Sequence, residues 1–444
     1  MNSKSIASQI FLSGLNGVVP AKLIRDEVSL AEDMLRIQDF NFSLKGIKHI
    51  YLLGAGKASA NMAMELERIL GSRISGGHIV VKYGHQSQLR YTEVTEAGHP
   101  VPDLNSYRAS RIILEFAHKA TDEDLVICLL SGGGSSLMAD LPMGISEQEM
   151  SLTNSLLLNS GADIKEINSV RKHLSRIKGG QLALAAHPAR VISLILSDVI
   201  GNPLDVIASG PTVADPTTYK DAMEVIQKYQ LEKTVPATVI HYLKNGVAGG
   251  FPETLKPENP VLHRVKNLII GDNAKALEAA RLQAIDLGFE TKVLTSSLSG
   301  NTIEVTDNLI RNAIEMAGDS GTKHPLCLLL GGETTLRVEG SGKGGRNQHM
   351  ALRAATLLEN YEGITFLAAG TDGTDGPTPV AGAVVDAQTV REARAREINP
   401  WEYLGNYNSF HFFENAGGHI VTGPTLTNVM DMIVILVEKA RIPH

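Results

Sequence analysis

The sequence predicts an α/β protein built from βαβ units, because short apolar segments of strand length alternate with longer segments of helical spacing. Several of the short segments are apolar without interruption, as expected of parallel strands that helices cover on both faces. Glycine-rich turns directly follow several of these segments. The chain has 444 residues, enough for about two or three such domains.

The expected elements fall into two sets. In the N-terminal set, strands are predicted at 48–53, 77–82, 125–130 and 190–196, and helices at 57–70, 105–119, 146–158 and 163–187. In the C-terminal set, strands are predicted at 266–271, 290–294, 325–330 and 364–369, and helices at 273–287, 302–317 and 346–359, before a final apolar helix or strand. The segment 249–260 (GGFPETLKPENP) is the expected linker, which gives domains of 1–252 and 261–444. A long polar loop at 197–218 is expected to be functional.

Composition and charge argue against several classes of protein. Lys and Arg total 41 against 48 for Asp and Glu, a net charge of −7, so no nucleic-acid partner is expected. The longest apolar runs, such as 191–196 (VISLIL), are much shorter than the roughly 20 residues of a membrane helix. The first residues lack a signal-peptide pattern, and Cys128 and Cys327 lie in apolar runs without disulfide or zinc spacing. We therefore expect a cytoplasmic protein that does not bind a membrane.

Glycines cluster directly after predicted strands at 54–56, 132–134, 331–332 and 370–376. In open α/β sheets such turns lie at the carboxyl ends of strands, where backbone amides and helix N-termini attract anions. One such turn alone would favour simple tight packing of small residues, whereas four of them with hydroxyls or charges favour an anion site. The predicted cofactor-binding residues are Gly54, Gly56, Ser131, Gly132, Gly133, Gly134, Ser135 and Ser136.

Charged side chains in the same segments are candidates for the chemistry. Lys57 and Arg346 each follow a glycine turn at a predicted helix start, where a phosphate or carboxylate contact is weighed against a solvated helix residue. Asp198 follows a buried strand and could hold Mg²⁺, accept a hydroxyl proton or merely cap a turn. Glu333 and Asp372 are candidate metal ligands or turn acids. Weaker candidates are the turn acid Asp375 and two possible substrate contacts, His99 and His419.

Known nucleotide motifs are sparse. Neither glycine–lysine pair fits the Walker A pattern, and no nucleophile elbow of the GxSxG type occurs. The pattern GxGxxG occurs once, at Gly340, Gly342 and Gly345. Because the preceding TTLRVE segment reads as a polar strand and not as a buried one, the pattern supports dinucleotide binding only weakly.

A set of motifs spread over nearly the whole chain resembles the class II glycerate kinase family. Its C-terminal module is called MOFRL, and many of its members were long labelled putative hydroxypyruvate reductases. The motifs are GAGKAS (54–59), SGGGSS (131–136), VRKHLSRIKGGQLA (170–183), SDVIGNPLDVIASGPT (197–212), GGETT (331–335), GKGGRNQ (342–348) and AAGTDGTDGPT (368–378).

The resemblance implies a Rossmann-like α/β/α N-terminal domain, a smaller C-terminal α/β domain, and an active site in the cleft between them. It also implies ATP-dependent phosphorylation of D-glycerate, usually at the 2-hydroxyl, with ATP and Mg²⁺ as cofactors. The family's catalytic lysine, aspartate and arginine map onto Lys57, Asp198 and Arg346, and the candidate metal ligands are Asp198, Glu333 and Asp372. Because these residues come from both predicted domains, domain closure is expected to assemble the site.

Two rival functions stay open from the sequence. A nicotinamide-dependent hydroxypyruvate reductase is suggested by the single GxGxxG pattern and by the family's older label. A non-catalytic module that binds a sugar acid or a nucleotide is the second rival. The sequence also leaves open a homodimer and the choice between 2- and 3-phosphoglycerate as product.

Overall fold

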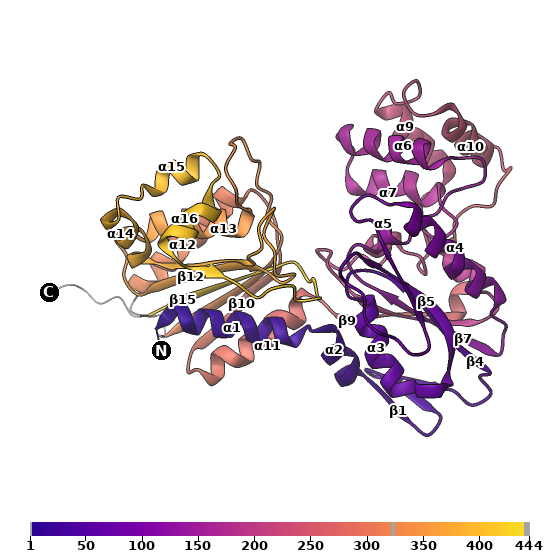
Figure 1. The fold of residues 1–444 in the computed structure, drawn as a ribbon, viewed down its shortest axis with the longest axis horizontal. Helices are drawn as coiled ribbons and strands as arrows, with labels where there is room; N and C mark the ends of the chain where they lie inside the picture. The colour runs from indigo at the N-terminus through magenta and orange to yellow at the C-terminus, as the bar shows by residue number, and fades with distance from the viewer. Residues whose placement is uncertain (1, 320, 322–324, 439–444) are drawn as a thin grey trace. The chain divides into compact units, whose positions relative to one another are not determined.

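The computed structural model describes residues 2–319, 321 and 325–438, and these form two compact units (Figure 1). The N-terminal unit comprises Leu23–Ser197 and Asn202–Ile270. The C-terminal unit comprises the described residues of Met1–Lys22, Asp198–Gly201 and Gly271–His444. These units differ from the expected limits of 1–252 and 261–444 in two ways. The first residues pack with the C-terminal half of the chain, and the chain up to Ile270, including the expected linker at 249–260 and most of the strand predicted at 266–271, belongs to the N-terminal unit.

A six-stranded sheet forms the centre of the N-terminal unit, with the strand order β6-β5-β4-β7-β8-β9. Its strands are β4 (His49–Ala55), β5 (Ile74–Lys82), β6 (Glu93–Ala97), β7 (Asp124–Leu130), β8 (Arg190–Leu196) and β9 (Val265–Gly271). The pairs from β6 to β8 are all parallel. Numbered along the chain, this is the order 3-2-1-4-5-6 of the doubly wound Rossmann fold, in which ligands bind where the order reverses. The Rossmann-like prediction is therefore confirmed, and the reversal lies between β4 and β7.

The helices of this unit both flank the sheet and form a separate cluster. They are α2 (Pro20–Glu27), α3 (Ser59–Leu70), α4 (Leu104–Lys119), α5 (Gly134–Leu137), α6 (Glu147–Asn159), α7 (Ile164–His173), α8 (Gln181–Ala186), α9 (Tyr219–Lys228) and α10 (Ala237–Val247). Helices α6, α7, α9 and α10 lie together at one end of the unit, beyond α5 (Figure 1). They share an apolar core that includes Leu157, Val170, Ile226 and Leu243.

The single helix predicted at 163–187 is wrong, because the chain leaves the helical conformation between α7 and α8. Gly179 and Gly180 have φ values of +59° and +79°, a left-handed conformation that glycine adopts at little cost. Their amides donate to the carbonyls of Ser209 and Gly210. The long loop at 197–218 therefore packs against this break, and its carbonyl groups fix the position of the glycines.

A small antiparallel sheet near the start of the N-terminal unit is absent from the sequence prediction. It consists of β1 (Val28–Ala31), β2 (Met34–Ile37) and β3 (Phe40–Ser43) in the order β1-β2-β3. Each strand has only four residues, which is too short for a clear alternation of apolar and polar positions.

The C-terminal unit also contains a six-stranded sheet, with the order β10-β11-β15-β12-β13-β14. Its strands are β10 (Glu290–Leu298), β11 (Leu326–Gly332), β12 (Ile364–Gly370), β13 (Gly382–Asp386), β14 (His419–Ile420) and β15 (Asp431–Val437). The pair β10–β11 is parallel, but β15 lies between β11 and β12 and is antiparallel to both. The expectation of a mainly parallel sheet is therefore wrong for this unit, because the final apolar segment is a central strand that runs against its neighbours.

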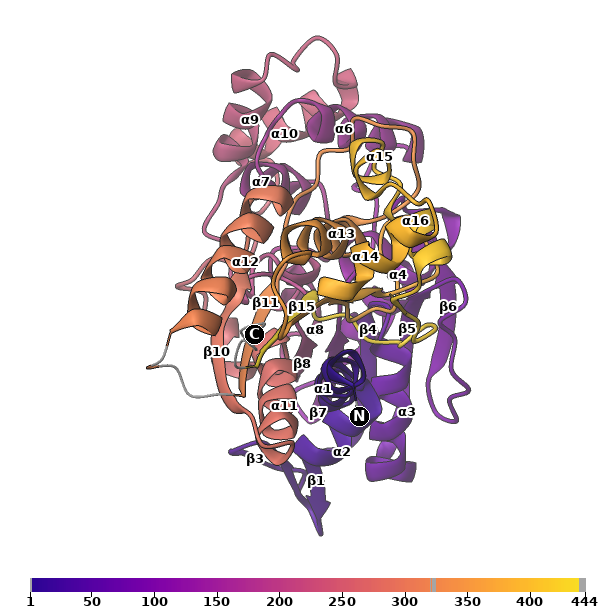
Figure 2. The same cartoon turned by 90° about the vertical axis from the view of Figure 1, so that its left-hand side faces the viewer.

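Helices cover both faces of this second sheet, so the unit has three layers. Its helices are α1 (Ser3–Gly17), α11 (Asn273–Asp286), α12 (Thr302–Gly318), α13 (Arg346–Leu358), α14 (Ala387–Ala395), α15 (Pro400–Gly405) and α16 (Ser409–Ala416). Helices α1 and α11 lie side by side on one face, and α12 to α16 lie on the other (Figures 1 and 2). The approach of α1 is close, because a Cβ on Gly14 would lie 2.9 Å from the carbonyl oxygen of Ala276 in α11.

Two expectations drawn from composition can be compared with the structure. Cys128 in β7 and Cys327 in β11 are buried and form no disulfide, which confirms that they pack in the core. Burial raises the pKa of each thiol to about 12. Among the described residues, no helix is both long enough and apolar enough to cross a membrane.

The spacing of β4 and β7 makes a testable prediction. A Cβ on Gly54 would lie 2.1 Å from the carbonyl oxygen of Leu129, so Gly54→Ala should force the backbone apart and cost about 1–3 kcal/mol of stability. Gly405→Ala in α15 is the control, because nothing lies within 4 Å of the added carbon. Thermal unfolding followed by circular dichroism should show a lower Tm for Gly54→Ala alone. An unchanged Tm would contradict the close approach of the strands.

Candidate functional site

The loops that follow β4 and β7 meet where the strand order reverses, and they bind each other. The amide of Lys57 donates to the carbonyl of Gly132 at 2.9 Å, and the amide of Ala58 donates to Ser131 Oγ at 3.0 Å. A Cβ on Gly56 would lie 2.0 Å from Ser131 Oγ. The glycines of the first loop are therefore required for packing of the two loops, and direct contact of Gly54 and Gly56 with a cofactor stays a prediction.

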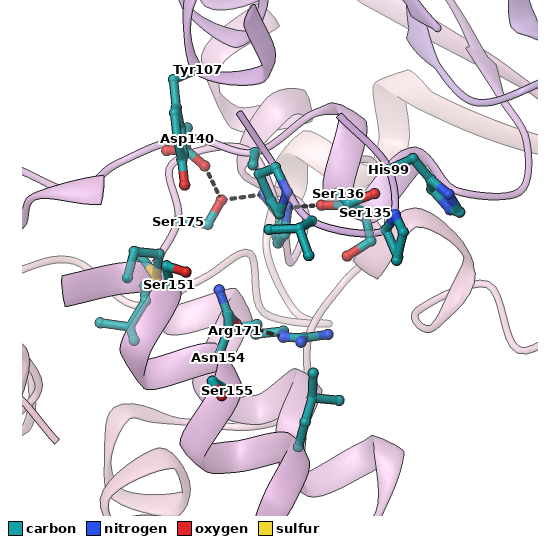
Figure 3. Close-up of a pocket in the computed structure, with 18 of the residues that line it drawn as sticks. His99, Tyr107, Ser135, Ser136, Asp140, Ser151, Asn154, Ser155, Arg171 and Ser175 are labelled. Carbon is teal, nitrogen blue, oxygen red and sulfur yellow. Dashed lines mark hydrogen bonds between the residues drawn. The ribbon is translucent and has the colours of Figure 1, made fainter. Parts of the chain in front are cut away.

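The second loop leads into a cavity of about 630 Å³ within the N-terminal unit. Gly133, Ser135 and Ser136 line it, as the sequence-based choice of these residues would require. Most of the rest of its wall comes from residues 99–102, helix α6 and the segment from α7 to the glycine break, and Tyr107 of α4, Ala139 and Asp140 complete it. Figure 3 shows Ser135, Ser136 and His99 on one side of this space, and Ser151, Asn154 and Ser155 of α6 on another.

Two cations that sequence reasoning missed line this cavity. Lys178 is almost fully buried, and its Nζ donates to the carbonyls of Ser135 at 2.8 Å and Met138 at 3.1 Å. Burial lowers the pKa of Lys178 to about 8. Arg171 on α7 donates from Nε to Asn154 Oδ1 at 2.8 Å, and burial lowers its pKa as well. Both belong to the VRKHLSRIKGG segment. The available signal for the cavity was Lys178, a basic residue directly before two glycines.

The acidic residue of the cavity is held by protein donors. The carboxylate of Asp140 accepts a short hydrogen bond from the Ser175 hydroxyl and a 2.7 Å bond from the amide of Arg176. The Arg176 Nε also lies 3.5 Å from the same carboxylate. These donors fix Asp140 at the cavity wall and offset its negative charge.

Lys57 lies close to the cavity wall. Its amide binds the glycine loop that lines the cavity, and its charge acts on His99, which also lines it. Gly133 lies against His99, because a Cβ on it would be 2.7 Å from the imidazole Cδ2 atom. Burial, and after it the positive charge of Lys57, lower the pKa of His99 to about 4. His99 is thus a neutral side chain of the cavity wall, next to the turn that carries Lys57.

Arg346 and Asp198, the other predicted catalytic residues, belong to the C-terminal unit. Arg346 begins α13 and donates from Nε and Nη2 to the two carboxylate oxygens of Asp431, at 2.6 and 2.9 Å. Its Nη1 lies 2.9 Å from Glu333 Oε1. Burial opposes the charge of Arg346, but the pairing with Asp431 outweighs burial and raises the pKa of the guanidinium. Asp431, at the start of β15, had no sequence signal.

The candidate metal ligands have other partners in the structure. Asp198 Oδ2 accepts a 3.4 Å hydrogen bond from Asn428, Asp372 Oδ1 accepts two bonds from Thr374, and Glu333 pairs with Arg346. Among the described residues, no cluster of three or more His, Cys, Asp or Glu side chains could hold a metal ion. Mg²⁺ that arrives with phosphates needs only one or two protein carboxylates, so the choice of these three residues stays a prediction.

The glycines of the GxGxxG pattern are explained by local packing. Added Cβ atoms on Gly340 and Gly342 would lie 2.6 and 2.4 Å from the carbonyl oxygen of Asn406, and one on Gly345 would lie 2.3 Å from Asp375 Cγ. The preceding TTLRVE segment forms no strand, so the strand, turn and helix of a dinucleotide site are not present here.

Asp375 and His419, the two weaker candidates in the C-terminal unit, both contact other groups of the protein. Asp375 is buried and caps α13, accepting from the amides of Asn347 and Gln348, and burial raises its pKa to about 6. His419 lies in β14 and stacks on Phe410 with ring centroids 5.0 Å apart.

The environment of His99 predicts its titration. The unfolded chain binds a proton at His99 near pH 6.5, whereas the folded chain does so only near pH 4. His99 should therefore reduce the stability of the fold as the pH falls from about 6.5 to 4. The imidazole NMR signal, assigned with His99→Gln, should not titrate above about pH 5. A midpoint near pH 6.5 would contradict the burial of the ring beside Lys57.

The ion pairs of Arg346 predict unequal effects of removing their partners. Asp431→Asn keeps the shape of the side chain but removes its charge, and should lower the free energy of unfolding by about 1.5–3 kcal/mol. Glu333→Gln is the control, because the Glu333 side chain is 46% exposed and an exposed pair contributes about 0–1 kcal/mol. Denaturant unfolding measures both. Equal losses would contradict the leading role of Asp431.

Comparison with known proteins places the chain among relatives of full length. A domain of unknown function (DUF4147) matches residues 6–244, and the MOFRL family matches residues 326–431. Over 444 residues the chain is 37% identical to a protein named glycerate 2-kinase from Pyrococcus horikoshii, with 99% of both covered. It is 38% identical to a D-glycerate 2-kinase from Thermotoga maritima, with 98% of both covered.

One solved structure and one relative with a different name also match the chain. The crystal structure of glycerate kinase from Thermotoga maritima matches with a TM-score of 0.87 over 98% of this chain and 99% of that one. A protein named putative hydroxypyruvate reductase from Agrobacterium vitis is 38% identical over 87% of this chain. Since the similarity to the named kinases spans both units at well above 30% identity, the chain belongs to the glycerate kinase family.

Proposed function

We propose that this protein transfers the γ-phosphoryl group of ATP to the 2-hydroxyl of D-glycerate, giving 2-phospho-D-glycerate and ADP. The observation that carries the proposal is full-length identity of 37–38% to two proteins named as 2-kinases of glycerate. The N-terminal unit supports it, because a cavity lined by two cations lies next to the loop that follows β7, where the order of the doubly wound sheet reverses.

The reaction needs positioning and charge neutralisation more than covalent participation of the protein. The substrate oxygen forms a bond to the γ-phosphorus while the bond to the β–γ bridging oxygen breaks, and the hydroxyl proton leaves to a base or to solvent. In this proposal Lys57 offsets negative charge on the phosphates, and Arg346 does so for a phosphate or the substrate carboxylate. Asp198 either orients the hydroxyl and takes its proton or serves as a metal ligand.

Mg²⁺ is part of the proposal, because the transferred group carries several negative charges. When bound, the ion would neutralise phosphate charge. The candidate ligands Asp198, Glu333 and Asp372 offer carboxylate oxygens, which Mg²⁺ prefers. Glu333 would have to be shared with Arg346, which lies 2.9 Å from it.

The decisive experiment compares two reactions of the purified protein. Release of ADP in the presence of D-glycerate and MgATP supports the kinase, and phosphorus NMR of the product distinguishes 2- from 3-phosphoglycerate. Oxidation of NADH with hydroxypyruvate, without release of ADP, would support the reductase named for the Agrobacterium vitis relative and would overturn the proposal. A 3-phospho product would overturn only the assigned position.

The proposed roles predict how activity responds to substitution. Lys57→Ala and Arg346→Ala should each lower kcat on the order of 10²-fold or more, as expected when a charge-stabilising donor is removed. The controls are Lys165→Ala on α7 and Arg281→Ala on α11, since Lys165 is exposed and Arg281 pairs with Glu278 of its own helix turn. Because Arg346→Ala also leaves Asp431 without its partner, Arg346→Lys serves as a second variant. It keeps the positive charge and loses the bidentate geometry.

Turnover like that of the unchanged protein in both alanine variants would remove Lys57 and Arg346 from the site.

A further inference from the structure

Among the residues that the structure describes, the two cations of the N-terminal cavity, Lys178 and Arg171, form no ion pair with a carboxylate. Their hydrogen-bond acceptors are neutral carbonyl or amide oxygens. The Lys178 side chain is nonetheless almost fully buried. Buried charges in proteins are normally paired, because removal of an ion from water is costly. A bound anion would supply the missing partner.

Asp140, the carboxylate of the cavity wall, does not replace that anion. Its oxygens accept from the Ser175 hydroxyl and the Arg176 amide, and the Arg176 Nε lies 3.5 Å from it. Its partial influence on Lys178 is outweighed by burial, which lowers the pKa of the lysine to about 8. At neutral pH Lys178 is still mainly protonated, so the cavity presents two positive charges to a ligand.

The size of the cavity indicates a ligand much larger than glycerate. A volume of about 630 Å³ lies in the middle of the roughly 300–1,000 Å³ that drug-sized ligands and cofactors occupy. Glycerate is a three-carbon acid and would leave most of this space to water. An ATP molecule, with its base, sugar and phosphates, is of the appropriate size.

The walls of the cavity differ in character from one side to the other. Gly133, Ser135 and Lys178 form a polar side next to the turn of Lys57. Val101 and Leu158 also line the cavity, and they are apolar yet 65% and 60% exposed. Exposed apolar side chains at the wall of a cavity favour a ligand with a flat apolar part.

We propose that this cavity is the nucleotide subsite, in which Arg171 and Lys178 bind the polyphosphate and Val101 and Leu158 pack against the base. The inference rests on the proposed kinase function and adds to it the residues that recognise the phosphate donor. The polyphosphate lies on the side of Ser135 and Gly133, with its terminal phosphate toward the turn of Lys57. The guanidinium of Arg171 donates to phosphate oxygens, and Asn154 holds it in position from α6.

The test measures binding of MgATP by isothermal titration calorimetry in the absence of D-glycerate. Arg171→Gln removes the positive charge but keeps an amide that can bond Asn154, and should weaken MgATP binding about 10- to 100-fold, the usual value of a hydrogen bond to a charged group. Lys165→Gln is the matched control, because Lys165 is exposed on the same helix and does not line the cavity. The KM for D-glycerate should change little in either variant, and equal Tm values show that both variants are folded.

A second pair of variants tests the apolar side. Leu158→Ser should weaken binding of MgATP but not of inorganic tripolyphosphate, since only ATP carries a base. Leu152→Ser is the control, because Leu152 is exposed on α6 outside the cavity. If Leu158→Ser weakens both ligands equally or neither, the base does not bind at this wall and the assignment is overturned.

The outcomes separate this inference from the proposed function. Unchanged MgATP affinity in folded Arg171→Gln overturns the subsite, whether or not the protein is a kinase. A raised KM for D-glycerate with unchanged MgATP affinity shows that the cavity holds the acid, which overturns the subsite and leaves the kinase intact. Binding of MgATP that depends on Arg171, without any release of ADP on addition of D-glycerate, supports the subsite and refutes the proposed function.

Discussion

The close approach of β4 and β7 is the constraint on which the N-terminal unit depends. At Gly54 and Gly56 any side chain would collide with the neighbouring strand or its loop. The two loops then use their own amides and a buried serine to bind each other. Their shape is therefore fixed by the protein before any ligand binds. Such preorganisation is useful where a catalytic group must be held with little freedom, and it sets the positions of Lys57 and of the glycine–serine turn together.

The candidate cations have two different surroundings in the structure. Arg346 is surrounded by carboxylates, so much of its charge is balanced within the C-terminal unit, and the bidentate pair with Asp431 chiefly fixes its orientation. Arg171 and Lys178 have neutral acceptors instead. The first arrangement favours stability, whereas the second carries a cost in stability that a bound anion, as we propose, would offset.

Much of the fold could be predicted from the sequence, because buried parallel strands are continuous apolar runs and glycine turns mark their ends. Strands β4, β7, β8, β11 and β12 were located in this way. The direction of β15 could not be predicted, because an apolar run looks alike in parallel and antiparallel sheets. The break at Gly179 and Gly180 depends on carbonyls about thirty residues later, which no local pattern reveals. Asp431 was missed for the same reason. Lys178 and Arg171 lie in the motif at 170–183, but the sequence does not tell which of its basic residues line a cavity, whereas Ser135 and Ser136, which also line it, were chosen from a local motif.

The central position of β15 in its sheet affects the order in which the chain can fold. Because β15 lies between β11 and β12 but follows both in the sequence, neither can gain its final neighbour until nearly the whole polypeptide has been synthesised. Helix α1 packs on the same sheet from the opposite end of the chain, so this half brings together segments of the greatest sequence separation. Contacts of that kind form slowly, since a long loop must close first. The strands of the N-terminal unit follow one another along the chain through crossover connections. This unit can therefore fold during translation, before the C-terminal unit does.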